Sequence, residues 1–228
     1  MAFPLSPLPR RRLAGLSLTA LLAAAGLVTL SPASLAALPA AAAPPDATPA
    51  AGALAPIRAL DKALIAIMQA GRTTPFEKRA EMLAPAVDRA FDLQQILRIS
   101  VGSDWSRFSA QVQSDLLAAF RRYTVASYVD NFDTFDGEHF VEQPVTRPLP
   151  GGEQVVLTQI VSRSGSSHQL NYVMRKVGDA WKAVDVLADG SISRVAVQRS
   201  DFRHLLDRGG APALMASLQR KTRDLSRG

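Results

Sequence analysis

Apolar residues recur at helical spacing in the sequence that follows residue 53. The pattern predicts an amphipathic helix that begins near Pro56 and ends before Gly71, a residue that commonly follows the last turn of a helix. The apolar positions, three and four residues apart, are Ile57, Leu60, Leu64, Ile67 and Met68.

Capping signals predict two short helices after this one. Residues 74–77 read Thr-Pro-Phe-Glu, which combines an N-cap residue, a proline at the first helical position and a glutamate three residues after the cap. We expect Pro85 to interrupt the helix that starts there. Asp92 and Gln95 then repeat the capping pattern ahead of the apolar residues that start at Leu93.

A long helix is predicted next, with Ser109 as its N-cap. Residues 131–137 contain two aspartates and a glycine, which favour turns and mark the change from helix to strand. The side chains expected on the inner face of the long helix are Val112, Leu116, Leu117, Phe120, Tyr123, Thr124, Ser127 and Tyr128.

The apolar period then changes from 3.6 residues to two. Residues 153–161, 168–177 and 180–187 are rich in β-branched and aromatic side chains and are separated by turn formers, and 139–142 is a weaker strand. We expect an antiparallel meander with one apolar face and one polar face. The apolar face should carry Val155, Leu157, Val161, Leu170, Tyr172 and Met174.

Helical spacing returns from Ser193, stops at Gly209-Gly210 and resumes at Pro212. The order of helices, meander and helices predicts an α+β domain in which N- and C-terminal helices pack on a curved antiparallel sheet.

The N-terminus resembles a secretory signal peptide. Arg10, Arg11 and Arg12 precede an apolar run over 13–30, and Ser34-Leu35-Ala36 fits a cleavage site. We expect residues 1–36 to be a signal peptide cleaved near Ala36, which would place the protein in the bacterial periplasm. The alternative is a retained membrane anchor.

The predicted cleavage divides the rest of the chain into a tether and a domain. Residues 37–53, rich in Ala and Pro, are expected to be a flexible tether, and 54–226 a single domain. The formal charge of +6 falls to +3 after cleavage, because three arginines and no acidic residues are lost. The basic residues are spread along the chain, so we expect no nucleic-acid partner.

The residues that most catalytic and metal sites need are scarce. The chain has no cysteine, and its three histidines, His139, His168 and His204, have no metal-ligand spacing, so we expect neither metal nor cofactor. The serines at 166–167 lack the small residue of a nucleophile elbow. The paired aspartates sit where turns and strand ends are expected. The pattern favours a binding protein over an enzyme.

Ordered strings of residues resemble the toluene-tolerance family of periplasmic lipid-binding proteins, the MlaC-like proteins. The resemblance covers roughly residues 54–225. The strings are Phe91-Asp92-Leu93 with Ile96, Gly102-Ser103-Asp104-Trp105, Phe120-Arg121-Arg122 with Tyr128, Asn171-Tyr172-Val173-Met174-Arg175, Trp181-Lys182-Ala183-Val184-Asp185-Val186, Arg199-Ser200-Asp201-Phe202 and Gly209-Gly210. Residues 131–138 and 189–193 look most like the hopanoid-associated HpnM branch.

This resemblance implies an NTF2-like fold and a non-enzymatic carrier whose sheet and helices enclose an apolar cavity for lipid tails. The implied ligand is a phospholipid or a hopanoid. The implied partners are an inner-membrane ABC or RND-type transporter and an outer-membrane complex. Trp105, Trp181 and Asp185 belong to the family pattern and look structural, whereas Arg199 would pair with a carboxylate or meet a lipid phosphate.

Eight side chains are expected to line or bound the cavity. They combine the apolar face of the meander with the inner faces of the helices: Phe120, Tyr128, Leu157, Leu170, Tyr172, Met174, Phe202 and Leu205. The alternative for each is an ordinary core position. The alternatives for the whole chain are an interaction protein that holds a lipid-transport or synthesis complex together without carrying cargo, and a small periplasmic hydrolase on the same fold.

Overall fold

The computed structural model describes residues 47–227. The predicted signal peptide and the predicted tether up to residue 46 lie outside the described residues. The helices are α1 (Ala47–Ala70), α2 (Phe76–Ala90), α3 (Leu93–Val101), α4 (Ala110–Asn131) and α5 (Arg194–Leu225), with short 3-10 turns at Gly102–Arg107 and Pro150–Gly152. The strands are β1 (His139–Glu142), β2 (Arg147–Pro148), β3 (Gln154–Val156), β4 (Thr158–Val161), β5 (Ser167–Val177), β6 (Ala180–Ala188) and β7 (Ile192–Ser193).

Helix α1 starts earlier than the sequence pattern indicates. It begins at Ala47, so the last part of the predicted tether, residues 47–53, is helical. Alanine has the highest helix propensity, which favours the extension. The helix also continues through Pro56, where packing outweighs the loss of one helical hydrogen bond. Ala53 is fully buried, and a Cβ on Gly52 would lie 3.0 Å from the ring of Trp181. Packing against the sheet therefore stabilises this end of the helix.

Two details of helix α2 differ from prediction. The hydroxyl of Thr74 donates to the carbonyl of Ala70 at 2.9 Å and does not cap α2, whose N-cap is Pro75. The helix also continues through Pro85 to its end at Ala90. The missing hydrogen bond at a proline is tolerated here because the helix buries Leu83 and Val87 completely. The expected interruption at Pro85 was wrong.

Other predicted helix boundaries are confirmed. The carboxylate of Asp92 accepts a hydrogen bond from the N–H of Gln95 at 3.0 Å, and the hydroxyl of Ser109 accepts one from the N–H of Val112 at 3.3 Å. Gly71 follows α1 with φ +62. Each of these signals acts within one turn of chain, which is why the sequence alone predicts it.

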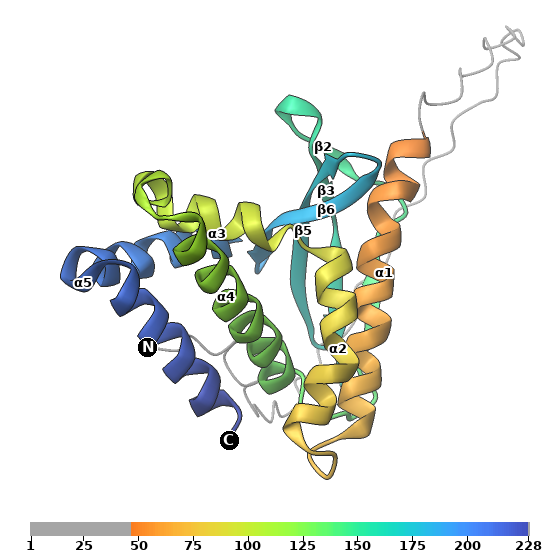
Figure 1. Cartoon of the computed structure of the whole chain (residues 1–228). Coiled ribbons are helices and arrows are strands. Elements are labelled where there is room, and N and C mark those ends of the chain that lie inside the picture. Colours follow the sequence, from red (N-terminus) through yellow and green to blue (C-terminus); the bar gives the residue numbers. More distant parts are fainter. Residues whose placement is uncertain (1–46, 228) are drawn as a thin grey trace, which may run out of the picture. The chain divides into compact units, whose positions relative to one another are not determined.

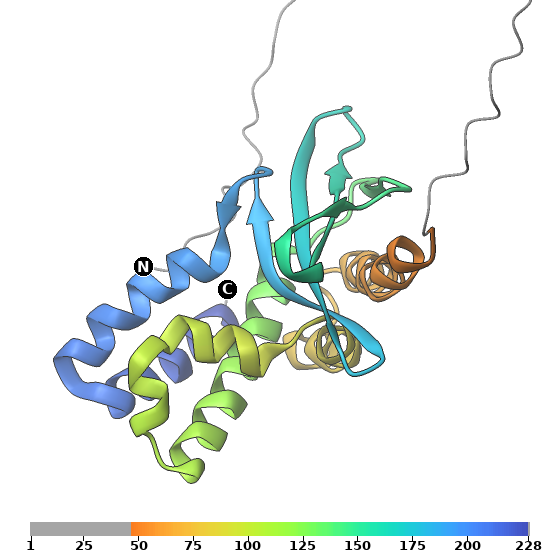
Figure 2. The ribbon, with the colours of Figure 1, turned by 90° about the horizontal axis from the view of Figure 1, so that it is seen from above.

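The strands form one curled antiparallel sheet, as expected (Figures 1 and 2). Strands β3 and β4 correspond to a single predicted strand that breaks at Leu157, and both pair with β5 on the same side. Strand β6 pairs with the other side of β5. At the break, the N–H of Thr158 donates to the side-chain oxygen of Asn171 at 3.2 Å, and its hydroxyl donates to the carbonyl of Leu170. Side chains thus replace the missing backbone bonds.

The expected polar face is absent from the centre of the sheet. Tyr172 and Val173 are neighbours in β5 and point to opposite faces, yet both are buried. Val155, which pairs with Val173, is also fully buried. On that second face Asp185 pairs with Val173 and accepts a hydrogen bond from the N–H of Val195 in α5. The first turn of α5 therefore covers part of the face that was expected to be exposed to solvent.

The helices pack as two groups. Helices α1 and α2 lie side by side and contact the sheet, whereas α4 lies beside α5 (Figure 1). Helix α5 folds back on itself at Gly209-Gly210, the predicted stop, where the backbone leaves helical geometry (Figure 2). The result is the α+β architecture predicted from the sequence. Within residues 47–227, no helix is long and apolar enough to cross a membrane.

Candidate functional site

Strand β5 places three of the predicted site residues on one face of the sheet. Leu170, Tyr172 and Met174 are alternate residues, and their exposed fractions are 7%, 0% and 0%. Helices α1 and α2 both contact the sheet. Phe91, directly after α2, packs against Tyr172 with ring centroids 6.2 Å apart, so this face looks toward these helices. The three side chains belong to the continuous hydrophobic core.

The fourth predicted sheet residue, Leu157, is not buried with them. It is half-buried at the break between β3 and β4, where its carbonyl accepts a hydrogen bond from the N–H of Gln143 at 2.9 Å. Val156 is the residue opposite Tyr172, and it is fully buried in the same core. The alternation assumed for this strand fails because the strand is interrupted, so Val156 was missed.

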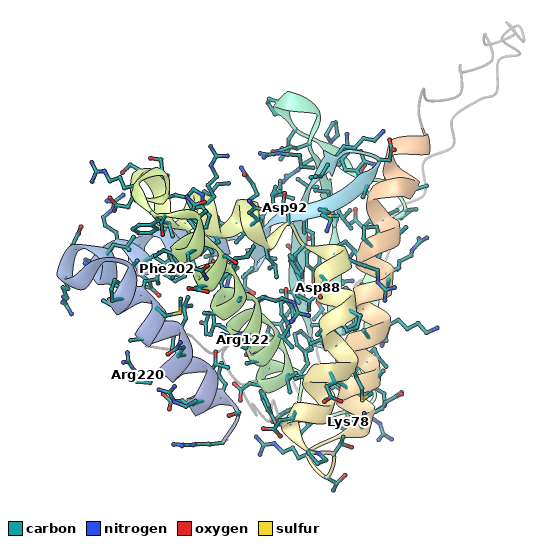
Figure 3. The ribbon with its side chains drawn as sticks, viewed as in Figure 1. Lys78, Asp88, Asp92, Arg122, Phe202 and Arg220 are labelled. Atoms are coloured by element: carbon teal, nitrogen blue, oxygen red, sulfur yellow. The ribbon has the colours of Figure 1, made fainter. Side chains whose placement is uncertain are left out.

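The pair of helices α4 and α5 supplies another part of the predicted site. Phe120 and Phe202 are almost completely buried, and their rings meet edge to face with centroids 6.2 Å apart. Figure 3 shows Phe202 where α5 lies beside α4. Leu205, one turn further along α5, is half-buried and packs against the same core.

A row of aromatic rings joins α4 to the sheet. The ring centroid of Tyr128 on α4 lies 5.8 Å from that of Phe91, and the ring centroid of Phe91 lies 6.2 Å from that of Tyr172. On its other side the ring of Tyr128 stacks on that of Phe132, with centroids 6.0 Å apart. The ring of Phe132 in turn lies 6.1 Å, centroid to centroid, from that of Phe140 on β1. The structure therefore brings Tyr128 and Tyr172 together. Phe91, Phe132 and Phe140 come from different elements, so spacing in the sequence did not reveal this row.

A buried carboxyl group lies beside this aromatic row. Asp61 of α1 is 4% exposed, and neither of its oxygens has a hydrogen-bond partner among the described residues. The pKa of Asp61 is raised to about 8, chiefly by burial and in addition by the negative charge of the nearby Glu142 on β1 and by the interaction of the two carboxyl groups. At neutral pH Asp61 is therefore mainly an uncharged carboxylic acid.

The two tyrosines share this environment. Burial raises the pKa of Tyr128 and of Tyr172 above the usual range, and the proximity of Asp61 adds to both shifts. The hydroxyl of Tyr172 also has no hydrogen-bond partner within the described part of the chain. Asp61 was missed by the sequence analysis. A signal for it existed, because it sits four residues after Ile57 and three before Leu64, on the apolar face of its helix.

Other residues singled out in the sequence have structural surroundings. Asp185 accepts hydrogen bonds from the N–H groups of Val186 and Val195 at 2.7 and 3.1 Å, and from the hydroxyl of Ser193, so it fixes the start of α5. Arg199 is exposed on α5 beside Gly102. A search of residues 47–227 gives no group of three or more acidic, histidine or cysteine side chains that could hold a metal ion.

An ion pair holds α4 against α2 on the other side of the aromatic row. Arg121 donates to both carboxylate oxygens of Asp88, at 2.7 and 2.6 Å. Figure 3 labels Asp88 on α2. The pair is partly exposed, so its main effect is to orient α4 relative to α2.

Residues 58–220 match the family model described as MlaC protein. The matched segment spans the whole described fold from α1 to the second half of α5. The chain belongs to the MlaC family. This confirms the family-level resemblance predicted from the ordered strings, and the matched segment includes all eight predicted site residues.

A solved structure shows the same fold. It is described as the phospholipid-binding protein from Ralstonia solanacearum in complex with a phospholipid. Its sequence is 20% identical to this MlaC family member, and the superposition covers 76% of this chain and 98% of that one with a TM-score of 0.66. No curated protein matches the chain. At this identity the likeness establishes the fold.

Proposed function

We propose that this protein is a lipid carrier that holds lipid tails between the inner face of the sheet and helices α1, α2, α4 and α5. The observation that carries the proposal is membership of the MlaC family together with the same fold in a protein solved with a phospholipid. The apolar face of β5 and the aromatic row supply a surface suited to hydrocarbon. The eight residues predicted from the sequence, including Leu205 and Tyr128, remain the proposed contacts.

Hydrocarbon burial supplies the driving force in this mechanism. Each CH₂ group removed from water contributes about 0.8 kcal/mol, so a pair of acyl chains or a polycyclic hydrocarbon binds without charged contacts. The side chains at the border of the core are half-buried, notably Tyr128, Leu205 and Phe140. These positions can repack around a ligand with less loss of native packing than fully buried ones. No covalent step is needed.

The ligand that we propose is either a phospholipid or a hopanoid. Residues 131–138 and 189–193 resemble the HpnM branch and favour the hopanoid, whereas the bound lipid of the Ralstonia protein favours a phospholipid. The N-terminal pattern supports action in the periplasm, with delivery to or from an inner-membrane ABC or RND-type transporter and an outer-membrane complex. The alternative remains a scaffold that joins such a complex without cargo.

Lipid extraction separates the carrier from the scaffold. Protein purified from the cells that make it should release lipid into organic solvent, and the stripped protein should take up added phospholipid or pentacyclic triterpenoid in native mass spectrometry. The variant Leu205→Glu should lose most of the lipid, because a charge next to hydrocarbon is unfavourable. The control Met82→Glu, at a residue 41% exposed on α2, should keep it. Empty wild-type protein that refuses both lipids would favour the scaffold.

A further inference from the structure

The strongest unexplained feature of the interior is a group of polar atoms without partners. Both carboxyl oxygens of Asp61 and the hydroxyl of Tyr172 are shielded from solvent, and none has a described residue within ordinary hydrogen-bonding geometry. The polar side chains nearest to them are Glu142, which acts on Asp61, and Tyr128, which acts on Tyr172. More than nine in ten buried polar groups in proteins are hydrogen-bonded. Three atoms without a well-placed partner on two neighbouring side chains therefore call for a partner other than residues 47–227.

These atoms lie where three elements meet. Asp61 comes from α1, Tyr172 from β5 and Tyr128 from α4, and the ring of Phe91 contacts both tyrosine rings. The two tyrosine hydroxyls and the Asp61 carboxyl are close enough to influence one another's ionisation. Fully buried apolar side chains surround them, including Ile57 and Leu64 of α1. Asp61, Tyr128 and Tyr172 thus form a small polar cluster inside the proposed tail-binding interior.

We propose that Asp61, Tyr128 and Tyr172 bind an uncharged oxygen atom of the lipid, an ester carbonyl or a hydroxyl, deep in the interior. This inference rests on the proposed carrier function. The two tyrosine hydroxyls and the protonated carboxyl of Asp61 can each donate a hydrogen bond, and each can also accept one. A carbonyl oxygen or a hydroxyl satisfies such a set, whereas a hydrocarbon leaves it unsatisfied.

The charges around the group argue against a phosphate at this position. Glu142 of β1 faces Asp61 and repels a negative charge there. Arg58 of α1 lies 3.9 Å from Glu142, where it is half-exposed and pairs with that carboxylate. Arg194 at the start of α5 is the positive group that acts on Tyr128. A phosphate at this position would approach the negative charge of Glu142, so the lipid headgroup lies away from Asp61 and the uncharged oxygen toward it.

The test compares lipids that differ only in the proposed oxygen. One pair is diacyl phosphatidylglycerol and its diether analogue, which lacks the ester carbonyls. The other pair is a pentacyclic triterpene alcohol and its parent hydrocarbon. In at least one pair, the wild-type protein should bind the oxygenated member about tenfold more tightly, the size expected for one well-made hydrogen bond in a buried site. The pair that shows the preference identifies the source of the oxygen.

Conservative variants then assign the preference to the three side chains. Tyr172→Phe and Asp61→Leu should each abolish most of it and leave the affinity for the ether or hydrocarbon member unchanged. Their melting temperatures should equal or exceed that of the wild type, because each removes a buried polar group without a partner. Tyr128→Phe, at a half-buried position, removes the third proposed hydrogen-bonding group and should likewise reduce the preference. The matched control is Tyr123→Phe, which removes a hydroxyl from α4 outside this group, under Lys221.

The outcomes distinguish the proposed oxygen-binding site from the carrier function on which it rests. A preference that survives both Tyr172→Phe and Asp61→Leu, or that is lost equally in Tyr123→Phe, overturns the inference. Equal affinity of the wild type for both members of both pairs also overturns it, while uptake of all four lipids would leave the carrier function standing. Failure of the wild type to bind any of the four would overturn the carrier function and the inference together.

Discussion

The ring of Phe120 on α4 meets the ring of Phe202 on α5 edge to face, with ring centroids 6.2 Å apart and ring planes at 86°. Both side chains are buried, and α4 and α5 pack closely along this line (Figure 1). The contact joins the segment before the sheet to the segment after it. The pair therefore ties the C-terminal helix to the helical half of the fold.

Truncation of this pair should destabilise the protein. Phe202→Ala should lower the free energy of unfolding by about 3–5 kcal/mol, because it removes buried area and leaves a cavity. Urea denaturation of lipid-free protein measures the loss. In a double-mutant cycle, Phe120→Leu and Phe202→Leu should show a coupling energy of about 0.5–1.5 kcal/mol. The exposed control Phe135→Ala should change stability little, and independent effects at 120 and 202 would contradict the account.

The carboxylate of Asp185 should matter for folding and not for lipid choice. It accepts hydrogen bonds from two backbone N–H groups and the Ser193 hydroxyl where α5 begins. Asp185→Ala should therefore lower the free energy of unfolding by about 1–3 kcal/mol, measured by thermal and urea denaturation. The same substitution at the exposed Asp179 is the control. A normal stability for Asp185→Ala, combined with altered lipid preference, would argue for a role in the site.

The turn within α5 should depend on the backbone freedom of Gly210. This residue has φ +59 and ψ −154, a backbone conformation that is essentially restricted to glycine. Gly210→Ala should lower stability by about 1–3 kcal/mol, the cost of holding a side chain in that region. Gly210→Asn should lose a similar amount, because ψ −154 lies outside the left-handed helical region that asparagine tolerates, so both variants should melt below the wild type. A higher melting temperature for the alanine variant would mean that the turn does not persist in solution.

Asp61 should make stability depend on pH. Its pKa is raised by burial from 3.8 in the unfolded chain to about 8 in the folded protein, so between these values the folded state holds more protons. The stability linked to this group is fully present below about pH 4 and is lost as the pH rises through 8. Asp61→Asn should therefore equal the wild type near pH 4 and exceed it by roughly 3–6 kcal/mol at pH 9.

The control for this titration is Glu142→Gln. Because the charge of Glu142 contributes to the raised pKa of Asp61, this variant should lower that pKa. The loss of stability between about pH 4 and pH 9 should then be smaller than in the wild type and should end at a lower pH. Denaturation curves across pH 4–9 for the three proteins measure the effect. Parallel curves for the wild type and Asp61→Asn would contradict the buried, neutral carboxyl.

Features encoded within a few residues were predictable from the sequence. Asp92 and Ser109 cap their helices as expected, and Gly209-Gly210 interrupts α5 at the predicted place. These signals act through local hydrogen bonds and backbone angles. The start of α1 and the continuation of α2 through Pro85 were not predictable in this way, because tertiary packing there outweighs the local preference.

The site was harder to predict than the fold because it depends on contacts between distant segments. The face of β5 that holds Tyr172 and Met174 follows from simple alternation, and both residues are buried as a result. Leu157 was placed on that face because the strand break could not be seen in the sequence, and Val156 takes the position beside Tyr172. The role proposed for Asp61 depends on tyrosines that come from two other elements, so spacing within its own helix could not indicate it.

The most direct test of the account is native mass spectrometry of the protein purified without added lipid, followed by identification of whatever it carries. The account predicts a one-to-one complex with a phospholipid or a hopanoid that survives purification and can be replaced by the same lipid after stripping. Protein that is empty as purified, and that takes up neither lipid afterwards, would contradict the carrier function and favour a scaffold.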